Sequence, residues 1–482
     1  MDAATQPFQA RTHLERRNLG EALHGNMEYL VRFAQVHESF RRSETEALAI
    51  VSNVDLEIVE YDEESPFCII KVPDEKAARA LVSRSVLVKS LYELWGKGQN
   101  YQELHEDVRR RSESKWPDYR TCSFKFDFDS YAGKRTSKEK IPLIQSFGYM
   151  AFEGPIIMAD PDETFIIFEL YDHRVASSRD KTSRTPSPQP EPSKLYFGRW
   201  LASGSRDVMD KYDLKKRSYI STTSMDAELS LVSANITLAA PGKVFYDPFV
   251  GTGSFCVAAA HFGAFTFGSD IDARSFKGQK EEGRPIGLVR NMLQYGLEAN
   301  YLDAFTSDLT NTPFRNMPIF DGIICDPPYG IREGLKVLGT REGKNVGPVY
   351  VDGVPTYTLE GYIPPKKPYS FEAMLNDILE FAAQTLVPNG RISFWMPTAN
   401  DEDIELAIPS NPHLELVSVC VQQFNKWSRR LLTYRRCLEG EASAIEPRAK
   451  TVPAGTTADE LNSFRKRYFQ RFTPKANSCS TP

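Results

Sequence analysis

The C-terminal half of the chain alternates short apolar runs with longer stretches of helical periodicity. The runs that predict strands are 243–246, 265–269, 304–308, 322–325 and 390–395. The stretches that predict helices are 222–240, 254–262, 285–295 and 371–386. Such alternation is typical of a mostly parallel, doubly wound α/β sheet with helices on both faces. Two later runs, 416–424 and 431–437, predict strands that close one edge of this sheet.

The N-terminal half has a different order of elements. Residues 27–98 show the pattern strand–helix–strand–strand–helix–strand, which is the order of a ferredoxin-like α+β unit. Residues 99–197 predict a second α+β unit, with helices at 101–111 and 138–147 and a strand at 164–170. Within this unit Phe124, Phe126 and Phe128 alternate with polar residues, so we expect them to face one side of a strand.

Several segments lack periodicity. We expect residues 1–26 to be a flexible lead-in and the Pro- and Ser-rich segment 176–193 to be a disordered loop. The α/β domain, 198–437, contains a stretch rich in Gly, Pro and Tyr at 331–368, which predicts either an active-site lid or disorder. The tail, 438–482, carries a predicted helix in which aromatic and basic residues mix.

Composition and charge narrow the class of protein. The chain has 482 residues and a net charge of −5, which argues against a globally basic, histone-like binder. The seven cysteines are dispersed, with no Cys-x-x-Cys pair and no Cys/His cluster. We therefore expect reduced thiols in a cytoplasmic protein, and no metal site. The N-terminus lacks an apolar signal-peptide core, and no apolar run is long enough to span a membrane.

A local basic stretch interrupts this acidic chain. Residues 109–140 contain ten Lys or Arg and five Asp or Glu. Two interpretations stay open, a solvated helix face or contacts to the phosphate backbone of a nucleic acid. On the second interpretation the contacts are Arg109, Arg110, Arg111, Lys134 and Arg135, together with Arg429 and Arg430 from another basic stretch at 426–436.

The sequence Asp326-Pro327-Pro328-Tyr329 follows the apolar run 322–325. Its carboxylate lies at the carboxyl end of a predicted parallel strand, the edge at which such sheets bind ligands. Two prolines fix the backbone and remove two N–H donors, so the neighbouring carbonyls are held rigid. Acceptors beside a flat aromatic ring suit a planar amino group: Asp326 and the Pro327 carbonyl would orient the amine, and Tyr329 would stack on its ring. The alternative is a Pro-Pro turn with a capping Asp.

Carboxylates also follow the other predicted strands. Asp247 precedes the turn Gly251-Thr252-Gly253, Asp270 ends the second strand and Asp308 ends the third. The turn is not a P-loop, because no Lys-Ser/Thr follows its glycines. Asp270 is placed to hold a ribose hydroxyl, Asp308 to meet an adenine amine, and Asp247 to attract an ammonium group. Together they predict a site for S-adenosylmethionine, although a helix N-cap stays open for each Asp alone.

With these motifs the chain resembles a known family. The catalytic subunits of eukaryotic tRNA guanosine-10 N2-methyltransferases are similar at 216–230, 247–255, 267–272, 307–309, 326–334 and 427–436. The resemblance covers roughly 195–437 well. It implies a Rossmann-like class I methyltransferase domain preceded by ferredoxin-like and THUMP-type domains. The chain departs from the family at Ser221-Thr222, where Gly-Pro is expected before Thr223.

The resemblance also implies roles for individual residues. The catalytic residues would be Asp326, Pro327, Pro328 and Tyr329. The contacts to S-adenosylmethionine would come from Thr223, Ser224, Asp247, Phe249, Gly251, Thr252, Gly253, Asp270, Ile271, Asp308 and Leu309. The substrate would be tRNA, with the 2-amino group of guanine 10 as target and the unit at 99–197 gripping the acceptor end. The partner would be a small zinc-binding activator protein, forming a heterodimer.

The residues alone leave other functions open. The same four catalytic residues would serve an amino-methyltransferase that acts on DNA adenine or protein glutamine. A relic methyltransferase domain would also be compatible with a non-catalytic RNA-binding protein. Only the family resemblance narrows the amine to guanine N2.

Overall fold

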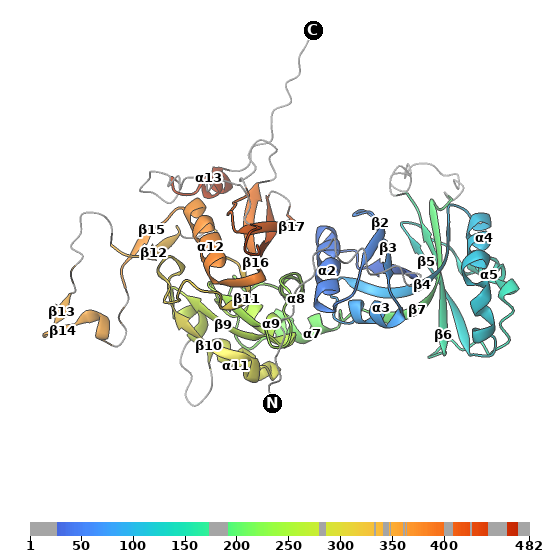
Figure 1. Cartoon of the computed structure of the whole chain (residues 1–482), viewed down its shortest axis with the longest axis horizontal. Helices are drawn as coiled ribbons and strands as arrows, with labels where there is room; N and C mark the ends of the chain where they lie inside the picture. The colour runs from blue at the N-terminus through green and yellow to red at the C-terminus, as the bar shows by residue number, and fades with distance from the viewer. Residues whose placement is uncertain are drawn as a thin grey trace, which may run out of the picture.

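The computed structural model of the chain describes residues 27–172, 191–278, 286–331, 334–340, 347, 349–359, 362, 364–399, 408–424, 427–441 and 460–470. The expected lead-in at 1–26 and nearly all of the expected loop at 176–193 lie outside these residues. The molecule is elongated, with a seven-stranded sheet toward each end (Figure 1).

The N-terminal sheet begins with the predicted ferredoxin-like unit. Its elements are β1 Met27–Phe33, α2 Glu38–Val51, β2 Glu57–Tyr61, β3 Phe67–Val72, α3 Glu75–Val82 and β4 Val88–Gly98. The four strands are antiparallel in the order β2-β3-β1-β4, as this pattern of elements predicts.

The second predicted unit extends this same sheet through β4. Its elements are α4 Tyr101–Ser112, β5 Phe124–Tyr131, α5 Ser137–Gln145, β6 Glu163–Leu170 and β7 Lys194–Ser203. The complete order is β2-β3-β1-β4-β7-β6-β5, so no break in hydrogen bonding separates the two units. The alternation in β5 directs Phe124, Phe126 and Phe128 into one aromatic cluster, in which Phe126 stacks on Phe197.

The C-terminal sheet has the doubly wound arrangement that the sequence predicts. Its elements are α8 Ala227–Ile236, β8 Val244–Asp247, α9 Ser254–His261, β9 Phe265–Asp270, α10 Arg274–Lys277, α11 Gly287–Tyr295, β10 Tyr301–Thr306, β11 Phe320–Cys325, α12 Phe371–Thr385, β16 Leu386–Ala399, β17 Leu414–Gln423 and β18 Trp427–Arg436. The strand order is β10-β9-β8-β11-β16-β18-β17. The first five strands are parallel, and β18 and β17 close the edge antiparallel.

Two expectations about this domain were wrong in detail. The helix expected at 222–240 spans only Ala227–Ile236, because Asp226 caps its N-terminus by accepting a hydrogen bond from the Leu229 N–H at 2.9 Å. The third strand runs from Tyr301 to Thr306 and not over 304–308, so Ser307 and Asp308 lie beyond its end.

Four short strands form two antiparallel pairs among the described residues of the segment 331–368. At its base β12 Lys336–Leu338 pairs with β15 Lys366–Pro368, and at its tip β13 Tyr350–Val351 pairs with β14 Val354–Pro355. Asp352 and Gly353 have φ angles of 48° and 76°. Two successive residues with positive φ make the tight turn of a two-residue hairpin, which their Asp-Gly sequence favours. The hairpin of β13 and β14 lies away from the body of the domain (Figure 1).

A shared core joins the ferredoxin-like unit to the C-terminal domain. Helix α2 packs against α8 and β17, and the ring of Phe40 stacks on that of Trp395 at 5.7 Å. The carboxylate of the fully buried Glu44 accepts a hydrogen bond from the Asn235 amide at 2.8 Å. One hydrophobic cluster contains residues of both parts, so the two ends are held in a fixed relation.

None of the helices described has the length and apolar character to cross a membrane. Over the same residues, no three His, Cys, Asp or Glu side chains form a group that could hold a metal ion.

Candidate active site

The strand order brings three of the predicted carboxylates together. Strand β8 lies between β9 and β11, and all three strands run parallel. Asp247, Asp270 and Asp326 follow or end these neighbouring strands, so they meet at one edge of the sheet. Their electrostatic interactions agree with this placement, because the charges of Asp270 and Asp326 both raise the pKa of Asp247.

Asp326 and Tyr329 form a hydrogen-bonded pair in this group. The Tyr329 hydroxyl donates to Oδ1 of Asp326 at 2.5 Å. Burial raises the pKa of Asp326 to about 6, although the Tyr329 hydroxyl and the charge of Arg429 act in the opposite direction. Burial and the Asp326 charge also raise the pKa of Tyr329, so Tyr329 stays protonated as a donor. Asp326 is therefore ionised above about pH 6.

Asp247 concentrates negative charge at the same edge. Its side chain is 3% exposed and accepts a hydrogen bond from the Phe249 N–H at 2.9 Å. Burial raises its pKa well above the ordinary value, and Asp270 and Asp326 add to that rise. Burial also raises the pKa of Asp270. A cation among the three carboxylates would relieve this repulsion, so the group fits the sulfonium and ammonium charges of S-adenosylmethionine.

The glycine turn takes the shape that its sequence predicts. Gly251 and Gly253 have φ angles of 47° and 79°, which L side chains rarely adopt. Asp270 supports the turn, because its Oδ2 accepts the Gly251 N–H at 3.2 Å. A Cβ atom on Gly253 would lie 2.0 Å from Cδ1 of Leu288, so no larger residue fits there.

Further residues predicted to contact S-adenosylmethionine lie near this turn. The Ser224 hydroxyl lies 2.7 Å from Oγ1 of Thr252, which ties the segment before α8 to the turn. Thr223 is exposed beside it, and Phe249 and Ile271 are half-buried. The structure therefore binds Ser224 to the turn, and Thr223, Phe249 and Ile271 lie within two residues of Ser224, Asp247 and Asp270 along the chain.

Asp308 and Leu309, two further predicted contacts to S-adenosylmethionine, also have structural contacts within the protein. Asp308 is 3% exposed, and its Oδ1 caps the short 3-10 helix η5 Leu309–Asn311 by accepting the Thr310 N–H at 2.9 Å. Its Oδ2 accepts the Leu338 N–H of β12 at 2.6 Å. Leu309 is buried in a hydrophobic cluster. The alternative of a helix N-cap thus describes Asp308, which holds the base of segment 331–368 against the sheet.

Arg429 and Arg430, which were predicted to contact RNA, lie on an inner strand of the sheet. Both lie on β18, which has β16 on one side and β17 on the other, and both are half-buried. The Arg429 guanidinium lies over the Trp395 ring at 4.7 Å, and its charge lowers the pKa of Asp326. Arg429 therefore belongs to the surroundings of the active site.

The basic stretch 109–140 is largely neutralised within the protein. Six of its ten cations pair with acids, namely Arg110, Arg111, Lys115, Arg120, Lys125 and Arg135. Arg111 bridges Asp107 and Glu28 at 2.7 Å each, and Arg135 lies 2.9 Å from the fully buried Glu169. The Arg109 guanidinium lies 4.0 Å from the centre of the Tyr149 ring. Of the five residues of this stretch that were predicted to bind RNA, Arg109, Arg110 and Lys134 are exposed, and Arg110 pairs with Asp107.

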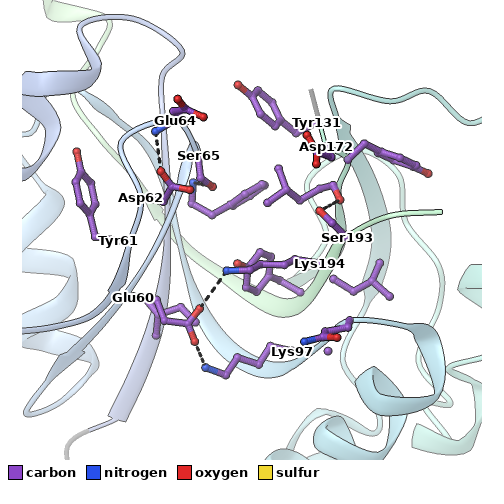
Figure 2. A pocket seen from close by; sticks show the side chains of 18 of the residues that line it. Glu60, Tyr61, Asp62, Glu64, Ser65, Lys97, Tyr131, Asp172, Ser193 and Lys194 are labelled. Carbon is purple, nitrogen blue, oxygen red and sulfur yellow. Dashed lines mark hydrogen bonds and ion pairs between the residues drawn. The ribbon is translucent and has the colours of Figure 1, made fainter. Parts of the chain in front are cut away.

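A cleft of about 940 Å³ opens on the N-terminal sheet, where the two units meet. Figure 2 shows Lys97 and Lys194 turned toward Glu60, with which both form ion pairs. Asp62 and Asp172 add further acids to the lining. The predicted RNA-binding residues are absent from the lining as far as the structure describes it, so the cleft does not have the charge of a phosphate site.

Sequence reasoning missed Asn291, which organises the turn from a helix. Asn291 is fully buried on α11, and its amide donates to the carbonyl oxygens of Tyr219 at 2.8 Å and Thr252 at 3.2 Å. Its Oδ1 accepts the Tyr219 N–H at 2.9 Å. No local pattern marks such a residue, because its three partners come from two distant segments.

Comparison with known proteins agrees with this geometry. A family model described as the Tmrp11 THUMP N-terminal domain matches residues 27–206, and one described as an RMKL-like methyltransferase domain matches residues 215–339. The tRNA (guanine(10)-N(2))-methyltransferase of Saccharomyces cerevisiae is 41% identical over 455 residues, which are 92% of this chain and 99% of that protein. The chain belongs to this family.

Two further members of the tRNA (guanine(10)-N(2))-methyltransferase family support the assignment. The Schizosaccharomyces pombe protein is 35% identical over 92% of this chain and 96% of its own length. The human protein is 34% identical over 93% of this chain and 96% of its own length. The predicted family and fold class, a THUMP-type region before a Rossmann-like methyltransferase domain, are thus confirmed.

Proposed function

We propose that this chain methylates the exocyclic N2 amino group of guanosine 10 in tRNA, with S-adenosylmethionine as donor. The observation that carries the proposal is the pair of acidic strand ends, Asp247 as the last residue of β8 and Asp326 directly after β11. One acid lies beside a turn that suits a nucleoside, and the other lies beside two prolines and an aromatic ring. A cationic donor and a planar amine are the two groups that such a site would bring together.

The chain's own residues would orient the amine. The Asp326 carboxylate and the Pro327 carbonyl each accept a hydrogen bond from the guanine amino group, and the Tyr329 ring stacks on the base. These contacts direct the nitrogen lone pair toward the donor, and most of the rate enhancement comes from orientation and preorganised charge. The donor supplies an electrophilic methyl group on a positively charged sulfur. As the N–C bond forms and the S–C bond breaks, Asp326 takes the proton that the nitrogen loses.

A second group of residues in the site would bind the methyl donor, S-adenosylmethionine. Asp270 holds the ribose hydroxyls, Asp247 attracts the ammonium group, and the Gly251–Gly253 turn lets the backbone approach the donor closely. Thr223, Ser224, Phe249, Thr252 and Ile271 complete this pocket. A base paired within tRNA must leave its stack to reach Tyr329, so the substrate is unstacked on binding.

The partner we propose is a small zinc-binding activator protein, and the edge strand β10 is its docking surface. In the described chain β10 pairs only with β9, and Leu302 on it is 57% exposed. Val289 and Leu293 on the neighbouring α11 are also exposed. An open strand edge flanked by apolar side chains favours a protein partner. We place the complex in the cytoplasm, in keeping with the free thiols.

The test is methyl transfer in vitro. The chain and its activator are incubated with labelled donor and unmodified tRNA, and the nucleosides are analysed. We expect N2-methylguanosine from wild type and almost none from Asp326→Ala, whose donor affinity should stay within about threefold of wild type. Asp270→Ala should instead weaken donor binding. Label in DNA or in a glutamine peptide, and none in tRNA, would overturn the proposal.

A further inference from the structure

The C-terminal strap, residues 460–470, crosses the domain next to the catalytic loop. It contains α13 Ser463–Gln470, which lies above β16 and α12 (Figure 1). Leu461 and Phe464 are buried, and the Leu461 carbonyl accepts the Phe371 N–H at 3.2 Å where α12 begins. The ring of Phe464 lies 6.2 Å from that of Trp427 on β18. These contacts anchor the strap to the body of the methyltransferase domain.

Two side chains of the strap reach the backbone just after the catalytic residues. The Asn462 amide, which is 3% exposed, donates to the Tyr329 carbonyl at 2.7 Å across 133 residues of sequence. The Arg465 guanidinium donates to the Gly330 carbonyl at 2.6 Å and also to the carbonyl of Ile331. Three consecutive carbonyls of the catalytic loop are therefore bound by the strap.

The loop needs such partners because of its own sequence. The turn after Pro327 and Pro328 leaves the strand ladder, so its carbonyls have no strand to pair with. Gly330 has a φ angle of 70°, and a Cβ atom there would lie 2.8 Å from Nδ2 of Asn462. Buried carbonyls without partners are costly, and the strap supplies the missing donors.

An aromatic contact gives the strap a second route to Tyr329. The Tyr329 ring meets Trp427 edge-on at 6.5 Å, and Trp427 in turn meets Phe464. The side chain and the carbonyl of Tyr329 are thus both held through the strap. The same side chain donates to Asp326, so the strap fixes the residue that orients the catalytic carboxylate.

We infer that Asn462, supported by Arg465, is a positioning residue for methyl transfer, and that the C-terminal strap is part of the active site. The inference rests on the proposed function, because it assigns the strap a role in that reaction. Asn462 does not touch the substrate; it acts through the backbone of Tyr329.

The test separates positioning from helix capping. Asn462 also caps α13, since its Oδ1 accepts the Arg465 N–H at 2.9 Å. Asn462→Ser keeps an N-cap acceptor but loses the amide donor to Tyr329. The matched control is Lys466→Gln, on an exposed position of the same helix. Both variants are measured as full chains with the activator.

We expect Asn462→Ser to lower the single-turnover rate about 10- to 100-fold, with donor Kd and tRNA KM within about threefold of wild type. The acid limb of its pH–rate profile should move to higher pH, because a displaced Tyr329 no longer lowers the pKa of Asp326. Lys466→Gln should match wild type in the rate at saturating tRNA. A rate for Asn462→Ser equal to that of the control, or a loss without movement of the acid limb, would overturn the inference.

Hydrogen exchange separates this inference from the proposed function. The amides of residues 329–331 should exchange faster in Asn462→Ser than in wild type, whatever the substrate is. If wild type does not methylate tRNA but this difference is seen, the proposed reaction fails while the strap's hold on the loop stands. If exchange is unchanged, the strap does not hold the loop and the inference fails.

Discussion

Asp247 and Asp326 end neighbouring strands but have different surroundings. Asp247 is almost fully buried and accepts a hydrogen bond from the backbone N–H of Phe249. Asp326 is half-buried and accepts a hydrogen bond from the Tyr329 hydroxyl. Burial raises the pKa of both, and for Asp326 it reaches about 6. The proposed reaction requires ionised Asp326, because only the carboxylate can accept both the amine hydrogen bond and the departing proton.

The pH dependence of methylation follows from this pKa. Below about pH 6 the free enzyme holds a protonated Asp326, so kcat/KM for the donor should fall about tenfold per pH unit on the acid side. Tyr329→Phe keeps the ring but removes the hydrogen bond that lowers this pKa, so its acid limb should lie at higher pH. Rate profiles from pH 5 to 8 measure both. If the acid limb lay at the same pH in wild type and in Tyr329→Phe, Asp326 would not be the titrating group.

Lys134 and Arg135 are adjacent in sequence but differ in their contacts. Arg135→Gln removes the cation beside the fully buried Glu169, so we expect a loss of about 3 kcal/mol in unfolding free energy. Lys134→Gln changes an exposed side chain, so stability should hold while tRNA binding weakens and its salt slope falls by about 1. Urea unfolding and binding at several salt concentrations separate the two. A stable Arg135→Gln variant with a reduced salt slope would restore Arg135 as an RNA contact.

At the scale of elements, the periodicity of apolar residues predicted the positions of strands and helices, whereas runs of basic residues did not predict which side chains are exposed. The predicted order of strands and helices already places Asp247, Asp270 and Asp326 at the one edge of the sheet where the structure has them. The position of Arg429 on an inner strand could not be predicted, because a basic run has the same sequence on a surface and beside a tryptophan. The contact between Asn462 and the Tyr329 carbonyl was equally hidden, since it joins segments 133 residues apart.

The glycine turn offers a matched pair of substitutions. Gly253 and Gly242 share a φ angle of 79°, but a Cβ atom would lie 2.0 Å from Leu288 at Gly253 and meets nothing within 4 Å at Gly242. Gly242→Ala should cost about 1 kcal/mol, from backbone strain alone. Gly253→Ala adds steric overlap and should cost about 2–4 kcal/mol, with weaker donor binding. Urea unfolding compares them, and equal costs would mean that Leu288 moves aside freely.

At the scale of the whole molecule, the fold sets the distance between the methyltransferase site and the THUMP-type region. The methyltransferase site lies toward one end, and the THUMP-type region lies at the other (Figure 1). The core around α2 and α8 joins them. We propose that the far end grips the tRNA acceptor end, so that this spacing selects which nucleoside reaches Tyr329. That proposal requires the junction to be rigid.

A substitution of Phe40 tests whether the junction between the N-terminal sheet and the methyltransferase domain is rigid. Wild type should unfold in one calorimetric transition, because the two parts share a core. Phe40→Ala removes the ring that stacks on Trp395 and should lower the unfolding free energy of that single transition by about 3–5 kcal/mol. Ile50→Ala, at an exposed position of the same helix, is the control. Two separate transitions, only one of which responds to Phe40→Ala, would contradict a shared core.

The central claim is that this chain methylates the 2-amino group of guanosine 10. The most direct test compares an unmodified tRNA with the same tRNA carrying inosine at position 10, because inosine differs from guanosine only in lacking that amino group. With activator and labelled donor, the account predicts one methyl group per guanosine-10 tRNA at first turnover and no label in the inosine-10 tRNA. Equal labelling of the two tRNAs would contradict it.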